Sequence, residues 1–172
     1  GIALGLSASA GTNAIVLGTA ASAGNGIALG TSAAANGDTS IALGASASTS
    51  GSNDISFGSS AGLGSTGTST AKNQANRIAL GTDAGQYVSG NEDIAIGLSA
   101  GNNVSGSYNI AIGSSAGGNT AGDNNVAIGW QANLTNATGS HSTAVGASTT
   151  AASGATAVGY LANAAGDNSI AI

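Results

Sequence analysis

Ile2-Ala3-Leu4-Gly5 stands at the start of the chain, and close variants of this tetrapeptide recur along all 172 residues. The twelve copies begin at residues 2, 15, 27, 41, 55, 78, 94, 110, 126, 143, 156 and 170. Successive motif glycines, such as Gly18 and Gly30, lie too close together for repeat units that contain helices. The sequence therefore predicts an all-β solenoid of short coils.

A second glycine divides most of these coils. It stands four residues before the next motif in eight copies, at Gly11, Gly37, Gly51, Gly90, Gly106, Gly122, Gly139 and Gly166. Because glycine marks turns, each coil is predicted to hold two short strands and two turns.

The motif strand alternates large, small and large residues, so its two aliphatic side chains share one face. We expect this large face to line the interior. The predicted interior residues are Ile2, Leu4, Ile15, Leu17, Ile27, Leu29, Ile41, Leu43, Ile55, Phe57, Ile78, Leu80, Ile94, Ile96, Ile110, Ile112, Val126, Ile128, Val145 and Val158.

A column of small residues follows each motif. Alanine stands three residues after the motif glycine at Ala8, Ala21, Ala33, Ala47, Ala61, Ala84, Ala100, Ala116, Ala132 and Ala162, and Thr149 takes the remaining place. We predict a tight packing position there.

Composition excludes several functional classes. The chain has 30 glycines, no cysteine, 5% charged residues and a net charge of −5, with Lys72 and Arg77 as the only cations. Nucleic acid is not expected as a partner, because phosphate binding needs clustered cations. No apolar run approaches the length of a membrane-spanning helix, so the fragment is not expected to insert directly into a membrane. Without cysteine, disulfides are excluded.

Catalytic chemistry is not expected. The single histidine, His141, lies in a predicted turn without potential metal-ligand neighbours, so we expect no metal site. Glu92 and Asp93 are adjacent and would point to opposite faces of an extended strand. Residues 62–67 spell a dinucleotide-binding fingerprint, but no helix pattern follows it. We predict no enzyme activity and no cofactor.

The pattern [Ile/Val]-Ala-[Leu/Ile]-Gly-x-x-Ala, followed by glycine before the next motif, resembles the head domain of YadA-like trimeric autotransporter adhesins. The resemblance covers residues 1–172 as a single head domain of about twelve coils. It implies a left-handed parallel β-roll, assembled side by side as a homotrimer on a bacterial surface. It also implies outer-membrane anchoring through C-terminal regions absent from this chain, which we interpret as a fragment of a longer protein.

Two features depart from the family pattern. The four coils between Gly81 and Gly146 are longer than is common in such heads and should carry longer edge loops. The interval between Gly58 and Gly81 is the longest of all, which indicates an insertion at residues 59–77 that holds both cations. A tolerated surface loop and a binding loop remain alternatives for this insertion.

The resemblance implies a virulence-associated adhesin head that attaches bacteria to host cells or extracellular matrix. Expected partners are a host matrix protein or a cell-surface glycan or receptor. Lys72, Arg77, Trp130 and Tyr160 are the candidate contact residues. The alternative is a structural spacer or shaft segment of a surface or phage fibre. An ice-binding solenoid is less favoured, because no regular threonine ladder runs through the chain.

Overall fold

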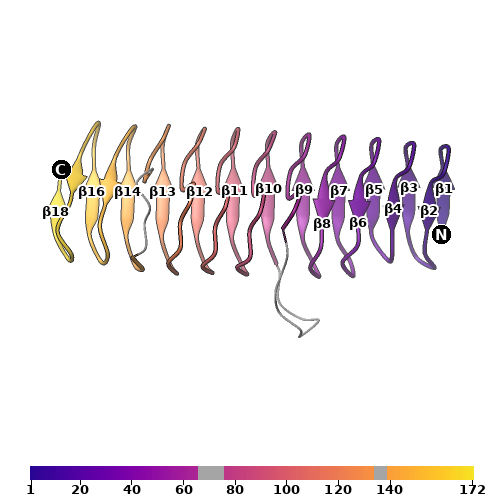
Figure 1. Ribbon diagram of the computed structural model, residues 1–172, viewed down its shortest axis with the longest axis horizontal. Coiled ribbons are helices and arrows are strands. Elements are labelled where there is room, and N and C mark those ends of the chain that lie inside the picture. Colours follow the sequence, from indigo (N-terminus) through magenta and orange to yellow (C-terminus); the bar gives the residue numbers. More distant parts are fainter. Residues whose placement is uncertain (66–75, 134–138) are drawn as a thin grey trace.

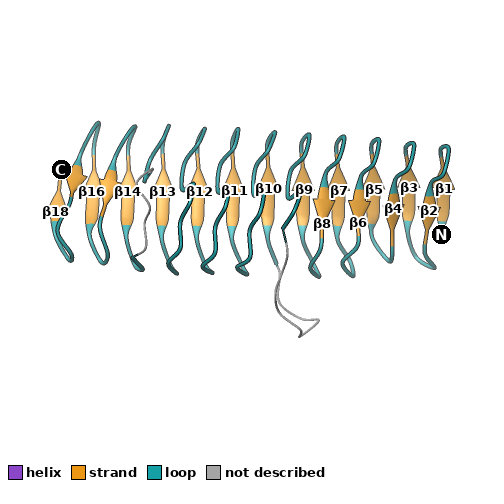
Figure 2. Ribbon diagram, viewed as in Figure 1, coloured by secondary structure: helices purple, strands orange, loops and turns teal. Residues whose placement is uncertain are grey.

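The computed structural model describes residues 1–65, 76–133 and 139–172, and in these ranges it is a rod of stacked β-coils without a helix. The N- and C-termini lie at opposite ends of the rod (Figure 1). Turns and loops make up much of each coil (Figure 2). The all-β solenoid prediction is confirmed.

Every motif forms a strand of one continuous parallel sheet. Its twelve strands, in spatial order, are β1 (Ile2–Leu4), β3 (Ile15–Leu17), β5 (Ile27–Leu29), β7 (Ile41–Leu43), β9 (Ile55–Phe57), β10 (Ile78–Leu80), β11 (Ile94–Ile96), β12 (Ile110–Ile112), β13 (Val126–Ile128), β14 (Thr143–Val145), β16 (Thr156–Val158) and β18 (Ile170–Ala171). Equivalent residues pair across neighbours, as in Ile94 with Ile110 and Ala95 with Ala111. Each coil therefore places its motif directly on the previous one.

In the described ranges, second strands lie toward the two ends of the rod. They are β2 (Ser9–Ala10), β4 (Ser22–Ala23), β6 (Ala34–Ala35) and β8 (Ser48–Thr49), then β15 (Thr150–Ala151) and β17 (Asn163–Ala164). These are the coils with the shortest intervals between motif glycines. Among the described residues between β9 and β14 there is no second strand. The prediction of two strands per coil is thus wrong for the coils between Gly81 and Gly129, which are described throughout; between Gly129 and Gly146 the place of the second strand lies outside the described residues.

The motif glycine makes a turn that other residues could not make. Gly97 has φ +128°, and a Cβ built on it would lie 2.7 Å from the Gly113 carbonyl carbon of the next coil. Ser99, two residues later, has φ 53°, and the Ala100 amide donates a 3.3 Å hydrogen bond to the Gly97 carbonyl. Sequence alternatives at Gly97 are excluded both by backbone conformation and by contact with the neighbouring coil.

The burial of the motif strand is the reverse of the prediction. The middle residue points inward, and Ala28, Ala42 and Ala111 are buried. The flanking large residues point outward, with Ile2 63% and Phe57 56% exposed. The predicted interior made of the motif's large aliphatics is therefore wrong. The coil is so thin that the motif alanine meets the small residues of the opposite wall.

The small-residue column is buried as predicted in every coil except the terminal ones. Ala21, Ala33, Ala47, Ala61, Ala84, Ala100, Ala116, Ala132 and Thr149 are buried, whereas Ala8 and Ala162 are partly exposed. The alanines on the two walls belong to the same buried clusters. A core built from alanine is what allows so short a coil to close.

Candidate binding surfaces and the polar core

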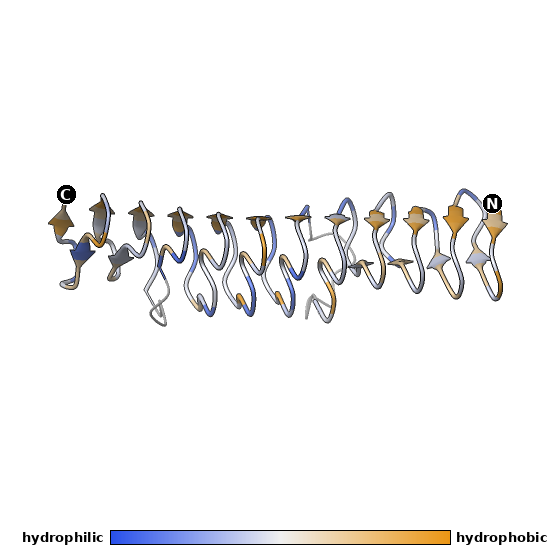
Figure 3. Ribbon diagram, turned by 90° about the horizontal axis from the view of Figure 1, so that it is seen from above, coloured by the Kyte–Doolittle hydropathy of each residue, from blue (hydrophilic) through white to orange (hydrophobic). Residues whose placement is uncertain are grey.

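The outward residues of the motif strands form one apolar surface, which we call the apolar ladder: the first and third residues of β1, β3, β5, β7, β9 to β14 and β16, with Ile170 of β18. Threonine occupies the first place in β14 and β16. Figure 3 shows the hydrophobic colour along the motif strands on one side of the rod. With strands about 4.8 Å apart and three residues about 10 Å long, the surface measures on the order of 500 Å². That is near the upper end of what a soluble monomer exposes.

The aromatic candidate residues lie on the surface. Trp130 is 54% and Tyr160 is 77% exposed, and each directly follows a motif glycine, as the sequence indicated. Lys72 lies outside the described residues. The structure thus leaves Trp130 and Tyr160 available for contact.

Arg77 does not lie on the surface, where a contact residue is needed. It is 7% exposed, and its Nη2 atom is 2.6 Å from Asp54 Oδ2. Nε donates to Asp54 Oδ1 at 3.3 Å, and Nη1 donates to the Val88 carbonyl at 3.2 Å. In this structure Arg77 is a core residue, which corrects its assignment as a partner contact.

Arg77 belongs to a buried column that the motif pattern did not predict. We call this column the polar ladder; its members directly precede the motif strands β9 to β14, and they are Asp54, Arg77, Asp93, Asn109, Asn125 and Ser142. All six are buried. A signal was present in the sequence, because the place before each motif changes from small residues to Asp, Arg and Asn where the coils lengthen.

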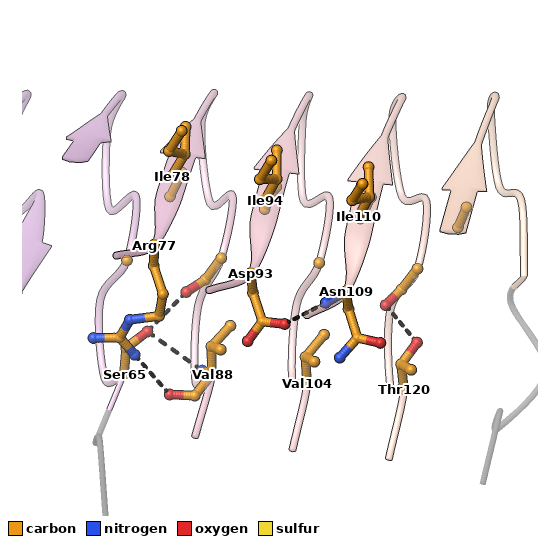
Figure 4. A pocket seen from close by; sticks show the side chains of 18 of the residues that line it. Ser65, Arg77, Ile78, Val88, Asp93, Ile94, Val104, Asn109, Ile110 and Thr120 are labelled. Atoms are coloured by element: carbon orange, nitrogen blue, oxygen red, sulfur yellow. Dashed lines mark hydrogen bonds between the residues drawn. The ribbon is translucent and has the colours of Figure 1, made fainter. Parts of the chain in front are cut away.

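Side-chain oxygens of the polar ladder accept hydrogen bonds from the backbone of the following coil (Figure 4). Asp93 Oδ1 accepts from the Asn109 amide at 2.8 Å, and Asn109 Oδ1 accepts from the Asn125 amide at 3.0 Å. Asn125 Oδ1 in turn accepts from the Ser142 amide at 3.0 Å. Asp54 Oδ1 serves the Arg77 amide in the same way at 3.0 Å.

In the short coils, the backbone amide of the residue before the motif strand finds a different acceptor. The Ala14 amide donates to the Gly11 carbonyl at 3.4 Å, and the Ala155 amide donates to the Ala152 carbonyl at 3.1 Å. Both bonds close a turn within one coil and need no side chain. Coil length and the residue before the motif therefore change together, because a longer coil must supply the acceptor from a side chain.

Burial perturbs the carboxyl of Asp93. Desolvation by burial raises the pKa of this carboxyl from 3.8 to about 6, and hydrogen bonds from Asn109 and the charge of Arg77 oppose the rise. Adjacent Glu92 is exposed, so the two acids point to different sides, as predicted. His141 is an exposed turn residue with φ 63°. The described residues hold no group of three or more potential metal ligands among His, Cys, Asp and Glu.

No helix in the described ranges has the length and apolarity required to cross a membrane. Comparison with curated proteins finds no match. The model of the YadA head domain repeat matches residues 21–47, 35–61 and 152–172. These matches lie toward the two ends of the chain. The coils between Gly58 and Gly146, which we call the wide coils, keep the same motif and register.

This repeat on a β-solenoid is typical of adhesins and structural proteins of the cell surface and not of enzymes. The sequence resemblance is thereby confirmed for these segments: residues 21–61 and 152–172 carry YadA head domain repeats, of the kind found in trimeric autotransporter adhesins.

Proposed function

We propose that this chain is one head domain, residues 1–172, of a homotrimeric adhesin that attaches a bacterium to host cells or extracellular matrix and contributes to virulence. The match to the YadA head domain repeat is the observation that carries the proposal. In this proposal the coil winds left-handed, and segments beyond this chain anchor the head to the outer membrane. The ligand is a host matrix protein, or a cell-surface glycan or receptor.

The apolar ladder supports assembly from copies of this chain. It runs the length of the rod, and its described members include no charged residue. Because equivalent residues repeat in register, the ladder of one copy matches the spacing of another copy laid alongside it. Burial of about 500 Å² of apolar surface would contribute on the order of 10 kcal/mol per chain before the entropy of association is subtracted.

Sedimentation of the purified chain tests the assembly. We expect three times the chain mass. The double variant Ile94→Glu plus Ile110→Glu places two charges on the apolar ladder and should abolish the trimer. A matched control, Ser105→Glu plus Ser89→Glu, adds the same charges away from the ladder and should leave the trimer intact. A folded wild-type monomer at micromolar concentration would exclude this assembly.

Binding to immobilised matrix proteins, to glycan arrays and to host cells tests the adhesive role. We expect the wild-type trimer to bind at least one of these surfaces, and the charged ladder variant to lose most binding because multivalency is lost. Trp130→Ala and Tyr160→Ala should each reduce affinity by about fivefold or less if the binding free energy is distributed over many weak contacts.

To test the insertion, a segment shorter than the predicted residues 59–77 is exchanged. Ser65 and Arg77 are core residues, so the exchange is limited to residues 66–75, which are replaced by Gly and Ser at the same length. This exchange removes Lys72 and retains both flanking core residues. Total loss of cell binding by an intact trimer would locate the site in the insertion and contradict the distributed model.

The spacer function remains the second candidate. The observation in its favour is the uniformity of the rod, in which every motif strand stacks residue for residue on the next. A trimer that binds none of the host surfaces would support this function.

A further inference from the structure

The wide coils enclose a cavity between two rows of side chains. One row is the polar ladder, and the other holds Val88, Val104 and Thr120, which stack seven residues after successive motif glycines (Figure 4). The volume open to the centres of water molecules is about 30 Å³. A buried water needs roughly 10–15 Å³ by this measure, so the cavity has room for two.

Unpartnered polar atoms of the polar ladder belong to residues that line this cavity. Asp93 Oδ2, Asn109 Nδ2 and Asn125 Nδ2 are buried and make no hydrogen bond, although Oδ1 of each side chain accepts a hydrogen bond from the backbone of the next coil. These residues are 6%, 5% and 2% exposed. A buried polar atom without a partner costs about 1–3 kcal/mol, and three in one column point to a ligand.

We propose that this cavity binds two water molecules in single file, one between Asp93 and Asn109 and one between Asn109 and Asn125. The site is independent of adhesion and belongs to the wide coils alone.

The repeat distance of the rod fits such bridges. Neighbouring coils are about 4.8 Å apart, so a water about 2.8 Å from equivalent atoms of two coils subtends an angle of about 118°, close to tetrahedral. The bonding also balances. The first water donates to Asp93 Oδ2 and accepts one N–H of Asn109 Nδ2. The second accepts the other Asn109 N–H and one from Asn125.

Thr120 completes the second water's bonds. Its hydroxyl donates to the Gly117 carbonyl at 2.9 Å, and the same oxygen can still accept a hydrogen bond from the water. A metal cation fits less well, because two of the three unpartnered atoms are amide N–H donors. Methyl groups of Val88 and Val104 face the column and keep its waters few.

A high-resolution crystal structure of the assembled chain would show the waters directly. We expect one density peak within hydrogen-bond distance of Asp93 Oδ2 and Asn109 Nδ2, and a second near both Asn amides and Thr120 Oγ1. Magnetic relaxation dispersion of water ¹⁷O counts long-lived internal waters in solution and should report two per chain.

Val104→Ile adds one methylene to the cavity without touching the polar ladder, and it should displace at least one of these waters. The control Val145→Ile adds the same group on the outer sheet face, where isoleucine already occurs at Ile112 and Ile128, and should displace none. A dry cavity in the wild-type crystal, amides rotated onto protein carbonyls, or a peak with cation-like coordination would each overturn the proposal. These wild-type readouts decide the matter even if Val104→Ile does not fold.

Discussion

At the residue scale, backbone conformation restricts the sequence of each turn more than side-chain contacts do. The motif glycines have φ from +125° to +143°, and most would press a Cβ into the glycine of the next coil. Two positions later, non-glycine residues such as Ser46 and Ser115 adopt the left-handed α region. Each coil therefore repeats a turn that few sequences tolerate, which explains why the motif varies so little.

Replacing Gly97 by alanine should destabilise the protein by several kcal/mol, because the new Cβ is strained at φ +128° and collides with Gly113. Gly24→Ala is the matched control. A Cβ there meets nothing closer than 3.9 Å, and Gly24 has no positive φ. Thermal unfolding of the two variants measures the difference. Equal melting temperatures would contradict the role assigned to the motif glycine.

Ala100 should not accept a larger side chain. It is fully buried against the opposite wall of a thin coil, so Ala100→Leu is expected to cost about 3 kcal/mol or more. Denaturant unfolding measures this loss, with exposed Ala45 changed to leucine as the control. An unchanged free energy of unfolding would show that the wall can move apart.

The pKa of Asp93 predicts a pH dependence. Because the folded carboxyl has a pKa of about 6 and the unfolded one a pKa near 3.8, the folded state binds the proton more tightly. Stability contributed by the protonated form is therefore present below about pH 4 and is lost as the pH rises to about 6. Asp93→Asn should raise stability at pH 7, by about 3 kcal/mol at most, and change it little at pH 4.

Exposed Asp167→Asn changes the net charge equally and serves as the control for Asp93→Asn. Melting temperatures between pH 4 and pH 8 test the sign. If Asp93→Asn destabilises the protein at pH 7, the carboxylate is needed in its charged form and our interpretation is wrong.

At the element scale, the strand is only three residues long, and its neighbours determine what it buries. Alternation predicted correctly that the two aliphatics share a face, but it could not say which face is inside. The distance between the two walls of the coil determines which face is inside, and that distance depends on all residues of the coil. The alanine column was the better guide, because small residues in both walls, such as Ala111 and Ala116, require the walls to lie close together.

Asparagines of the polar ladder should contribute more to stability than exposed asparagines do. Asn109→Ala leaves the Asn125 amide without its acceptor inside the coil, and we expect a loss of about 1–3 kcal/mol. Asn163→Ala, on an exposed strand position, is the control. Chemical denaturation compares the two, and equal effects would show that the ladder bond is replaced at no cost.

At the scale of the whole molecule, the sequence predicted the solenoid, its coil boundaries and its family, because these depend on a period that can be read directly. It did not predict that Arg77 is buried, because this burial depends on pairing with Asp54 in the previous coil, which is distant in sequence. The repeat pattern also could not predict the residues that contact a ligand, because the repeat does not determine which residues occupy the surface positions used for adhesion.

The stacked register also determines how such a rod can change its length. Within the wide section the motifs follow at a constant interval, from Ile78 through Ile94 and Ile110 to Val126, so loss or gain of one interval would join like to like. At either border of that section a join would pair a side-chain acceptor with a coil built without one. Loss or gain of one such interval would therefore keep the hydrogen-bond pattern of the rod intact, whereas a cut at Asp54–Arg77 or at Ser142 would break it.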